Sequence, residues 1–365
     1  MFIAKKFFLV LLVPCLFTMS SVTGKLHAEE NPFPVPNGLR DAVDFWKKIF
    51  TLYSEHEIVF HNPEDHKKIY SVISVPENKQ NLNALINAER ARIINQYGLH
   101  GKTDQVRSQR GAREQFQISH ERSQRYLTGM RRVFREEKLP VDLAYLPHVE
   151  SAFDNSARSH AGALGIWQLM PIAIVRFNQG DMRLDPYAST RAAAKILREN
   201  YLGFGKNWPL ALTAYNFGPT AVAQARDAVG SSDLVTIIRE YNHSRFGYEP
   251  KNFYAEFLAI REMLNNKEAP FLTRRPFQPF RFREVKIKKA VPVQSLLKTA
   301  AVHERQFFDW NKSLDRRAEE VPAGYALNLP RERMERFISV HRQLVDTPPV
   351  SQLASARPPR KRLGS

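Results

Sequence analysis

Near the middle of the chain the sequence reads Pro140-Val-Asp-Leu-Ala-Tyr-Leu-Pro-His-Val-Glu150-Ser-Ala-Phe153. This stretch holds the first of the motifs that indicate the fold. It starts as a helix, with Pro140 at a favourable first position. Apolar side chains recur at three-residue steps from Leu143 to Val149, which makes one helix face apolar. Glu150 adjoins that face, so we expect its carboxyl group to be partly desolvated and its pKa to be raised.

A carboxylic acid that stays protonated near neutral pH suits the cleavage of a glycosidic bond, because the leaving oxygen must receive a proton. Taken alone, a glutamate near a helix end is more often a solvated surface residue. The next segment, Ser159-His-Ala-Gly-Ala-Leu-Gly165-Ile-Trp-Gln-Leu-Met-Pro171, is a glycine-punctuated loop with polar and aromatic groups, as in many substrate sites. Further on, Gly218 is placed to end one helix and Pro219 to start the next.

Three motifs in this order resemble the family of lytic murein transglycosylases with a goose-type-lysozyme-like fold. The motifs are Glu150-Ser151-x-Phe153, Gly165-x-x-Gln168-x-Met170-Pro171 and Ala214-Tyr215-Asn216-x-Gly218. The resemblance covers roughly residues 135 to 260. It implies that Glu150 is the catalytic acid and then the base. It further implies contacts with the substrate for Ser159, Gln168, Met170, Tyr215, Asn216, Glu249 and Tyr254.

Within this set the resemblance implies separate roles. Ser159 would orient the sugar or an intermediate, and Gln168 with Met170 would line the glycan groove. Tyr215 would donate a hydrogen bond to the catalytic carboxyl group, with Asn216 nearby. Glu249 matches a second family acid that binds rather than reacts, and Phe253 stands next to Tyr254 where relatives often carry tyrosine.

Three of these residues also have purely structural interpretations. Tyr215 lies on an alanine-rich helix and is suited to packing in the core. Ser159 is a suitable helix N-cap, and Met170 is a suitable core residue. No cofactor is implied, and the spacing of His148 and His160 around Glu150 matches no familiar metal-ligand motif.

The motifs supply one reactive acid, whereas ordinary glycosidases use two carboxyl groups. With Glu150 alone, the expected product is a 1,6-anhydromuramic acid end formed by capture of the sugar's own C6 hydroxyl. A hydrolysing muramidase is the alternative enzyme, with Asp154 as second carboxylate if the helix continues that far. A wall-binding protein without catalytic activity is the alternative from another class.

The whole chain is predicted to be mainly α. We expect a signal peptide at 1–28, a helical N-terminal region with one hairpin at 29–134, and an all-helical lysozyme-like catalytic domain at 135–265. A small α+β unit at 277–332, similar to a LysM glycan-binding module, and a disordered basic tail at 345–365 would follow. The N-terminal region is predicted to hold a helix over 39–50 and strands over 57–61 and 68–75.

The apolar run from Phe7 to Met19, preceded by two lysines, predicts export to the periplasm. Cys15 is the only cysteine, and lipid attachment there is the alternative to an ordinary cleaved signal. The formal charge is +17, and three lysines without any acid fall within residues 1–28, so the rest carries +14. This charge predicts a polyanionic partner. Since export argues against nucleic acid, we expect peptidoglycan glycan strands and an anionic wall or membrane surface as partners.

Overall fold

The computed structural model describes residues 31–75, 81–175, 181–268, 282–311 and 314–346. The predicted signal peptide with Cys15, and the predicted basic tail from 347 onward, lie outside the described residues. Within them, no helix is both long enough and apolar enough to cross a membrane.

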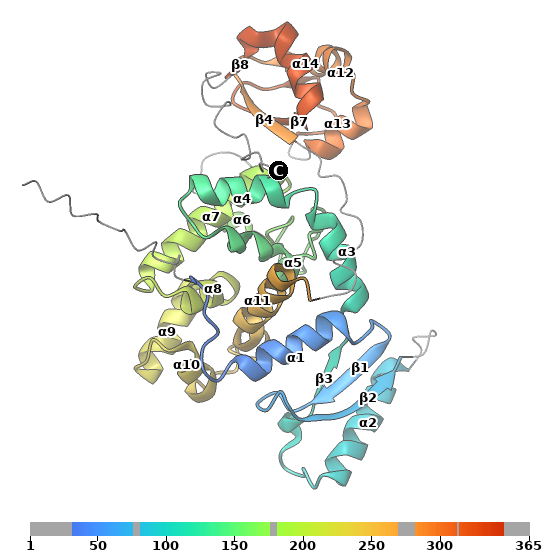
Figure 1. Ribbon diagram of the computed structural model, residues 1–365, viewed down its shortest axis with the longest axis vertical. Coiled ribbons are helices and arrows are strands. Elements are labelled where there is room, and N and C mark those ends of the chain that lie inside the picture. Colours follow the sequence, from blue (N-terminus) through green and yellow to red (C-terminus); the bar gives the residue numbers. More distant parts are fainter. Residues whose placement is uncertain (1–30, 76–80, 176–180, 269–281, 312–313, 347–365) are drawn as a thin grey trace, which may run out of the picture. The chain divides into compact units, whose positions relative to one another are not determined.

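The chain is mainly α-helical, as predicted, with three small sheets in the described residues (Figure 1). The α-helices are α1 (Arg40–Thr51), α2 (Leu82–Gln96), α3 (Arg113–Ser123), α4 (Leu127–Glu136), α5 (Pro147–Glu150), α6 (Pro171–Val175), α7 (Pro186–Gly203), α8 (Trp208–Phe217), α9 (Pro219–Val229), α10 (Leu234–Glu240), α11 (Tyr248–Asn266), α12 (Val293–Ala300), α13 (Glu304–Trp310) and α14 (Arg331–His341). The 3₁₀ helices are η1 (Thr103–Gln105), η2 (Val141–Tyr145) and η4 (Arg342–Leu344). The strands are β1 (Glu57–His61), β2 (Ile69–Ser74), β3 (Arg107–Arg110), β4 (Phe282–Ile287), β5 (Val291–Pro292), β6 (Glu320–Val321), β7 (Ala326–Pro330) and β8 (Val345–Asp346).

The core of the central part forms around α11, which contacts α1, α8 and α5 (Figure 1). Nearly every residue from Pro250 to Ile260 is buried, because aromatic and aliphatic side chains occupy all faces of that stretch. Phe33, upstream of α1, packs edge-on against Phe257 with ring centroids 5.1 Å apart. Helices α1 and α11 are thus held together by residues far apart in the sequence.

The N-terminal region contains the predicted helix and hairpin and one element that the sequence did not indicate. Strands β1 and β2 pair antiparallel around the turn, and β3 joins the other edge of β1 in the order β2-β1-β3. Strand β3 reads Arg107-Ser-Gln-Arg110 and lacks the apolar alternation that predicts strands. It pairs with β1 through backbone hydrogen bonds, so the N-terminal region holds a third strand beyond the predicted hairpin.

The C-terminal unit has its own apolar core, which includes the fully buried rings of Phe307 and Phe337. Strands β4 and β7 pair antiparallel, with β5, α12, α13 and β6 between them in the chain, so the unit is α+β, as predicted. Helix α14 and strand β8 extend the ordered elements to Asp346. The unit therefore continues past the predicted end at 332, and residues 345 and 346 form a strand rather than a tail. Glycan binding by this unit stays a prediction.

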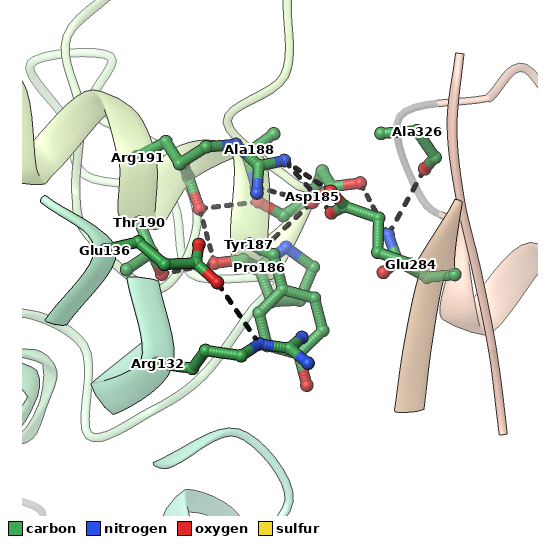
Figure 2. Close-up of polar contacts among 12 residues, drawn as sticks. Arg132, Glu136, Asp185, Pro186, Tyr187, Ala188, Thr190, Arg191, Glu284 and Ala326 are labelled. Carbon is green, nitrogen blue, oxygen red and sulfur yellow. Dashed lines mark hydrogen bonds and ion pairs between the residues drawn. The ribbon is translucent and has the colours of Figure 1, made fainter. Parts of the chain in front are cut away.

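A buried polar junction joins the start of α7 to the C-terminal unit (Figure 2). The Asp185 side chain is 1% exposed and caps α7 by accepting the backbone N–H groups of Tyr187 and Ala188. Its other oxygen accepts a hydrogen bond of 3.0 Å from Nδ2 of Asn328, on β7. Beside it, Arg191 donates to Glu284 of β4. Burial raises the pKa of Asp185 to about 6, although the capping N–H groups favour its ionised form.

Candidate active site

Glu150 is the last residue of α5, which is a single turn that begins at Pro147. The stretch starts as a helix, as predicted, but as the 3₁₀ helix η2, and Pro140 is its N-cap rather than its first residue. The chain then leaves the helix with Ala152 and Phe153 in the left-handed region, at φ 50° and 56°. This turn directs Phe153 into the core, where it is 1% exposed, and ends the helix before Asp154, as its sequence suggests.

The carboxyl group of Glu150 has a desolvated environment. Its Oε1 is buried and has no hydrogen-bond partner within the described part of the chain. Burial, and secondarily the nearby Glu256 carboxyl, raise the pKa of Glu150 to about 8. Glu150 is therefore protonated at neutral pH, which is the state required of a general acid.

The loop between residues 159 and 171 is fixed by its own backbone. Gly165 has φ +79°, and a Cβ atom there would lie 2.1 Å from the backbone oxygen of Arg183. The Nε2 atom of Gln168 donates to the backbone oxygens of Gly165 and Ala157, at 2.9 and 3.2 Å. Ser159 caps no helix. Its Oγ instead accepts the backbone N–H of Ala163. Both polar residues thus brace the loop, and contacts of theirs with a sugar stay predictions.

Tyr215 lies beside the acid but does not make the expected hydrogen bond. Its hydroxyl donates to the backbone oxygen of Trp167 at 2.9 Å, so its one proton is already committed. The Trp167 indole in turn donates to Thr190 of α7. Burial, with a further contribution from Glu150, holds the pKa of the Tyr215 phenol well above its ordinary value. Tyr215 therefore holds the loop at Trp167, and its hydroxyl donates no hydrogen bond to the carboxyl group of Glu150.

The other predicted substrate contacts differ in how exposed their side chains are. Met170 is 39% exposed and Asn216 is exposed, so both are available at the surface and Met170 is not core filling. Glu249 is also exposed, and its Oε1 lies 3.0 Å from Arg107 of β3. Tyr254 is fully buried on the core side of α11. Its assignment as a substrate contact is therefore corrected to a core residue.

Glu256 is a residue of the site that the sequence reasoning missed. It lies on α11 between Ala255 and Phe257, which are both buried. Burial, and then the charge of Glu249, raise the pKa of Glu256 to about 8. The sequence signal was a single carboxyl residue among apolar and aromatic residues between Phe253 and Ile260. This signal becomes informative only once the packing of α11 against α5 is known.

Asp154, the alternative second carboxylate, is held by hydrogen bonds from Ser156 and by an ion pair with Arg122. Its oxygens accept from the backbone and hydroxyl of Ser156 at 2.8 and 2.6 Å, and Arg122 lies 3.6 Å away. No group of three or more histidine, cysteine, aspartate or glutamate side chains suited to a metal is found among the residues described.

Comparison with known proteins finds similarity in the region of the site. Residues 134–237, which include Glu150 and the loop that follows it, match the family described as Transglycosylase SLT domain. The chain is also similar to the membrane-bound lytic murein transglycosylase D of Escherichia coli strain K12 and of strain O6:H1. Identity to each is 30% over 152 residues, which are 40% of this chain and 33% of the relative.

The chain thus matches about a third of the length of these relatives. Among solved structures, the 70 kDa soluble lytic transglycosylase of Escherichia coli aligns with a TM-score of 0.34 and 21% identity, over 40% of this chain and 25% of that one. The lytic transglycosylase Slt of Pseudomonas aeruginosa aligns with a TM-score of 0.33 and 23% identity, over 41% and 25%.

Proposed function

We propose that this protein is a peptidoglycan lytic transglycosylase that cleaves the β-1,4 bond between N-acetylmuramic acid and N-acetylglucosamine. The observation that carries the proposal is the desolvated Glu150 carboxyl, whose Oε1 has no partner within the described residues. An acid in this state can protonate a glycosidic oxygen at neutral pH. The SLT-domain match and the similarity to proteins named lytic murein transglycosylase D supply the substrate class.

The mechanism follows from the number of usable carboxyl groups. Glu150 donates its proton to the leaving oxygen, and an oxocarbenium-like state forms with assistance from the substrate's own N-acetyl group. The resulting carboxylate then takes the proton of the muramic acid C6 hydroxyl, which closes a 1,6-anhydro ring without consuming water. This capture depends on positioning rather than on a further catalytic group.

Hydrolysis needs a carboxylate that activates water, and none of the nearby acids is suited to that role. Asp154 is bonded to Ser156 and faces Arg122. Glu249 is exposed and paired with Arg107. Glu256 has a pKa of about 8 and is therefore protonated at neutral pH. The interactions of Asp154 and Glu249 and the protonation of Glu256 therefore favour the transglycosylase reaction over hydrolysis by a muramidase.

The location and partners follow from the same proposal. A substrate of glycan strands requires that the protein be exported, and the basic charge favours docking on an anionic wall or membrane surface. We place the protein in the periplasm on this basis. The C-terminal unit is a candidate for holding the glycan.

Zymography on purified murein with Glu150→Gln tests the proposal. We expect lysis to fall by at least about 100-fold, because glutamine is nearly isosteric and cannot supply a proton. Folding, followed by circular dichroism, and binding to sacculi should persist. Glu240→Gln, an exposed change on α10, is the matched control and should lyse murein like the unaltered protein. Substantial lysis by a folded Glu150→Gln protein would remove Glu150 from the chemistry.

Mass spectrometry of the products distinguishes the two enzyme classes. A transglycosylase gives muropeptides one water lighter than hydrolysis products, with ends that borohydride does not reduce. Mainly reducible N-acetylmuramic acid ends would show that the protein is a muramidase. Sacculus binding without any product would show a wall-binding protein.

A further inference from the structure

The edge of the N-terminal sheet places an arginine over the start of α11. Arg107 is the first residue of β3, which pairs only with β1 in the described part of the chain (Figure 1). Its Cζ atom lies 3.9 Å from the ring centroid of Tyr248, the first residue of α11. Its Nη2 atom donates to Oε1 of Glu249, the next residue, at 3.0 Å. Arg107 thus links a strand outside the SLT match to the helix that packs against α5.

A polar junction holds the Tyr248 ring in place. Asn252, which is buried one turn further along α11, donates to the backbone oxygen of Tyr248 at 3.0 Å. Its Oδ1 accepts from the Trp46 indole of α1 at 2.9 Å and lies 3.0 Å from Nε2 of His66. The Tyr248 hydroxyl lies 3.3 Å from Nε2 of His61, on β1. Side chains from α1, from β1 and from the β1–β2 turn therefore fix the start of α11.

The charged groups at this place are exposed and balance each other. The Glu249 side chain is 74% exposed and the Arg107 side chain is 38% exposed. Burial lowers the pKa of His61 to about 4 and also lowers the pKa of His66, so both rings are neutral at neutral pH. Arg107 has further N–H donors besides the one that Glu249 accepts. The pair can therefore donate and accept hydrogen bonds at once. Because it has no net charge, it suits sugar hydroxyl and N-acetyl groups better than an anion.

The pair lies on the face of α11 that leads toward the active site. Glu256 follows Glu249 by seven residues, so it lies on the same face, about 10 Å further along the helix. It is the one partly exposed residue in the otherwise buried stretch from Asn252 to Ile260. Helix α5, which ends at Glu150, packs against α11. A glycan strand is extended, so a strand bound at Glu150 also crosses neighbouring surface.

We propose that Arg107 is a substrate-binding residue, and that it forms with Glu249 a subsite for the hydroxyl and N-acetyl groups of a sugar beyond the cleaved bond. This inference rests on the proposed function and extends the glycan groove to a residue outside the SLT match. Stacking on Tyr248 orients the guanidinium in advance, so binding a sugar orders little additional side chain. The N-terminal region then takes part in substrate binding and does not only support α11.

NMR of arginine-labelled full-length Glu150→Gln protein tests the subsite without any need for activity. The Nε atom of Arg107 is buried, so its proton exchanges slowly and gives a signal that is assigned by its absence in Arg107→Gln. The probe is the β-1,4-linked tetramer of N-acetylglucosamine, which carries no peptide. We expect the Arg107 signal to shift and saturate with the tetramer. Glu249→Gln should weaken the affinity reported by this signal by about 10-fold, because a charge-assisted contact is lost.

Arg110→Gln is the matched control, since Arg110 is exposed on the opposite face of the same strand, and it should leave this affinity unchanged. Because the signal belongs to Arg107, binding elsewhere in the chain does not imitate the result. An Arg107 signal that stays in place while other signals shift would overturn the subsite. A shift only with peptide-bearing muropeptides would also overturn it, since the ligand would then be a carboxylate of the peptide.

Cleavage of soluble, peptide-free glycan strands is the second measurement. Arg107→Gln should raise KM by about 10-fold and leave kcat within about 2-fold, because the contact is made equally before and during the reaction. Adding Glu249→Gln to Arg107→Gln should raise KM little further, since the two residues act together.

Arg110→Gln should cleave these strands like the unaltered protein. If Arg107 only supports the fold, Arg107→Gln will lower Tm and kcat and leave KM unchanged, which would refute the proposal. Absence of cleavage by the unaltered protein, with an Arg107 signal that still responds to the tetramer, would overturn the proposed function alone.

Discussion

The buried acid of the active site should lower the stability of the folded protein as pH rises, and Glu150→Gln should remove that effect. The pKa of Glu150 is about 8 in the folded state, against an ordinary value of 4.5. Below pH 4.5 both folded and unfolded chains hold the proton. Between 4.5 and 8 the unfolded chain releases it and the folded chain does not, so the free energy of unfolding falls as pH rises.

The size of the effect follows from these two values. Each pH unit between them corresponds to about 1.4 kcal/mol, which sets a ceiling of about 5 kcal/mol on the cost of ionising Glu150 in the fold. Relaxation of the fold and entry of water around an ionised group reduce this cost. We therefore expect Glu150→Gln to recover about 2 kcal/mol at pH 9 and almost none at pH 4.

Urea unfolding at a series of pH values between 4 and 9 measures this difference directly. The unfolding midpoint of Glu150→Gln should exceed that of the unaltered protein by an amount that grows with pH, at a constant m-value. Glu240→Gln provides the control, since its side chain is exposed. A stability difference that is independent of pH would refute the reasoning, because it would mean that Glu150 titrates normally in the folded state.

Two further changes test the framework that surrounds the acid. Gly165→Ala should destabilise the protein by about 2 kcal/mol or more, measured by thermal unfolding, because its Cβ would clash with a backbone oxygen at 2.1 Å and φ is +79°; a normal Tm would contradict the tight loop. Asn328→Ala should cost about 1–3 kcal/mol at pH 7, because buried Asp185 loses a donor, and less at pH 4, where that carboxyl is protonated. Exposed Asn242→Ala is its control, and a cost that is equal at both pH values would exclude this account.

Local patterns in the sequence were sufficient wherever the physical cause is local. The helix around Phe45, the hairpin at 57–75 and the boundary at Gly218 follow from apolar spacing and from the backbone preferences of glycine and proline. The desolvation of Glu150 was also predictable, because it adjoins an apolar face of its own segment.

The features that the sequence did not predict depend on contacts between distant segments of the chain. Strand β3 exists because β1 offers a free edge, which its own polar side chains do not reveal. Tyr215 reaches a backbone oxygen 48 residues away, so its acceptor was not predictable from the motif. Tyr254 and Glu256 are two residues apart on α11, yet one is core and one is at the site. Only the packing of α11 on α5 assigns them.

The central position of α11 has a consequence for how this protein can be divided. The segment that matches the SLT family ends at residue 237, before α11 begins at Tyr248. A fragment cut to those bounds would lose the helix that contacts α1, α5 and α8, together with Glu249, Glu256 and Glu262, and would expose the apolar surface that it covers. The smallest fragment that can fold around Glu150 must therefore run from the segment before α1 to the end of α11, so sequence similarity marks the chemistry but underestimates the folding unit.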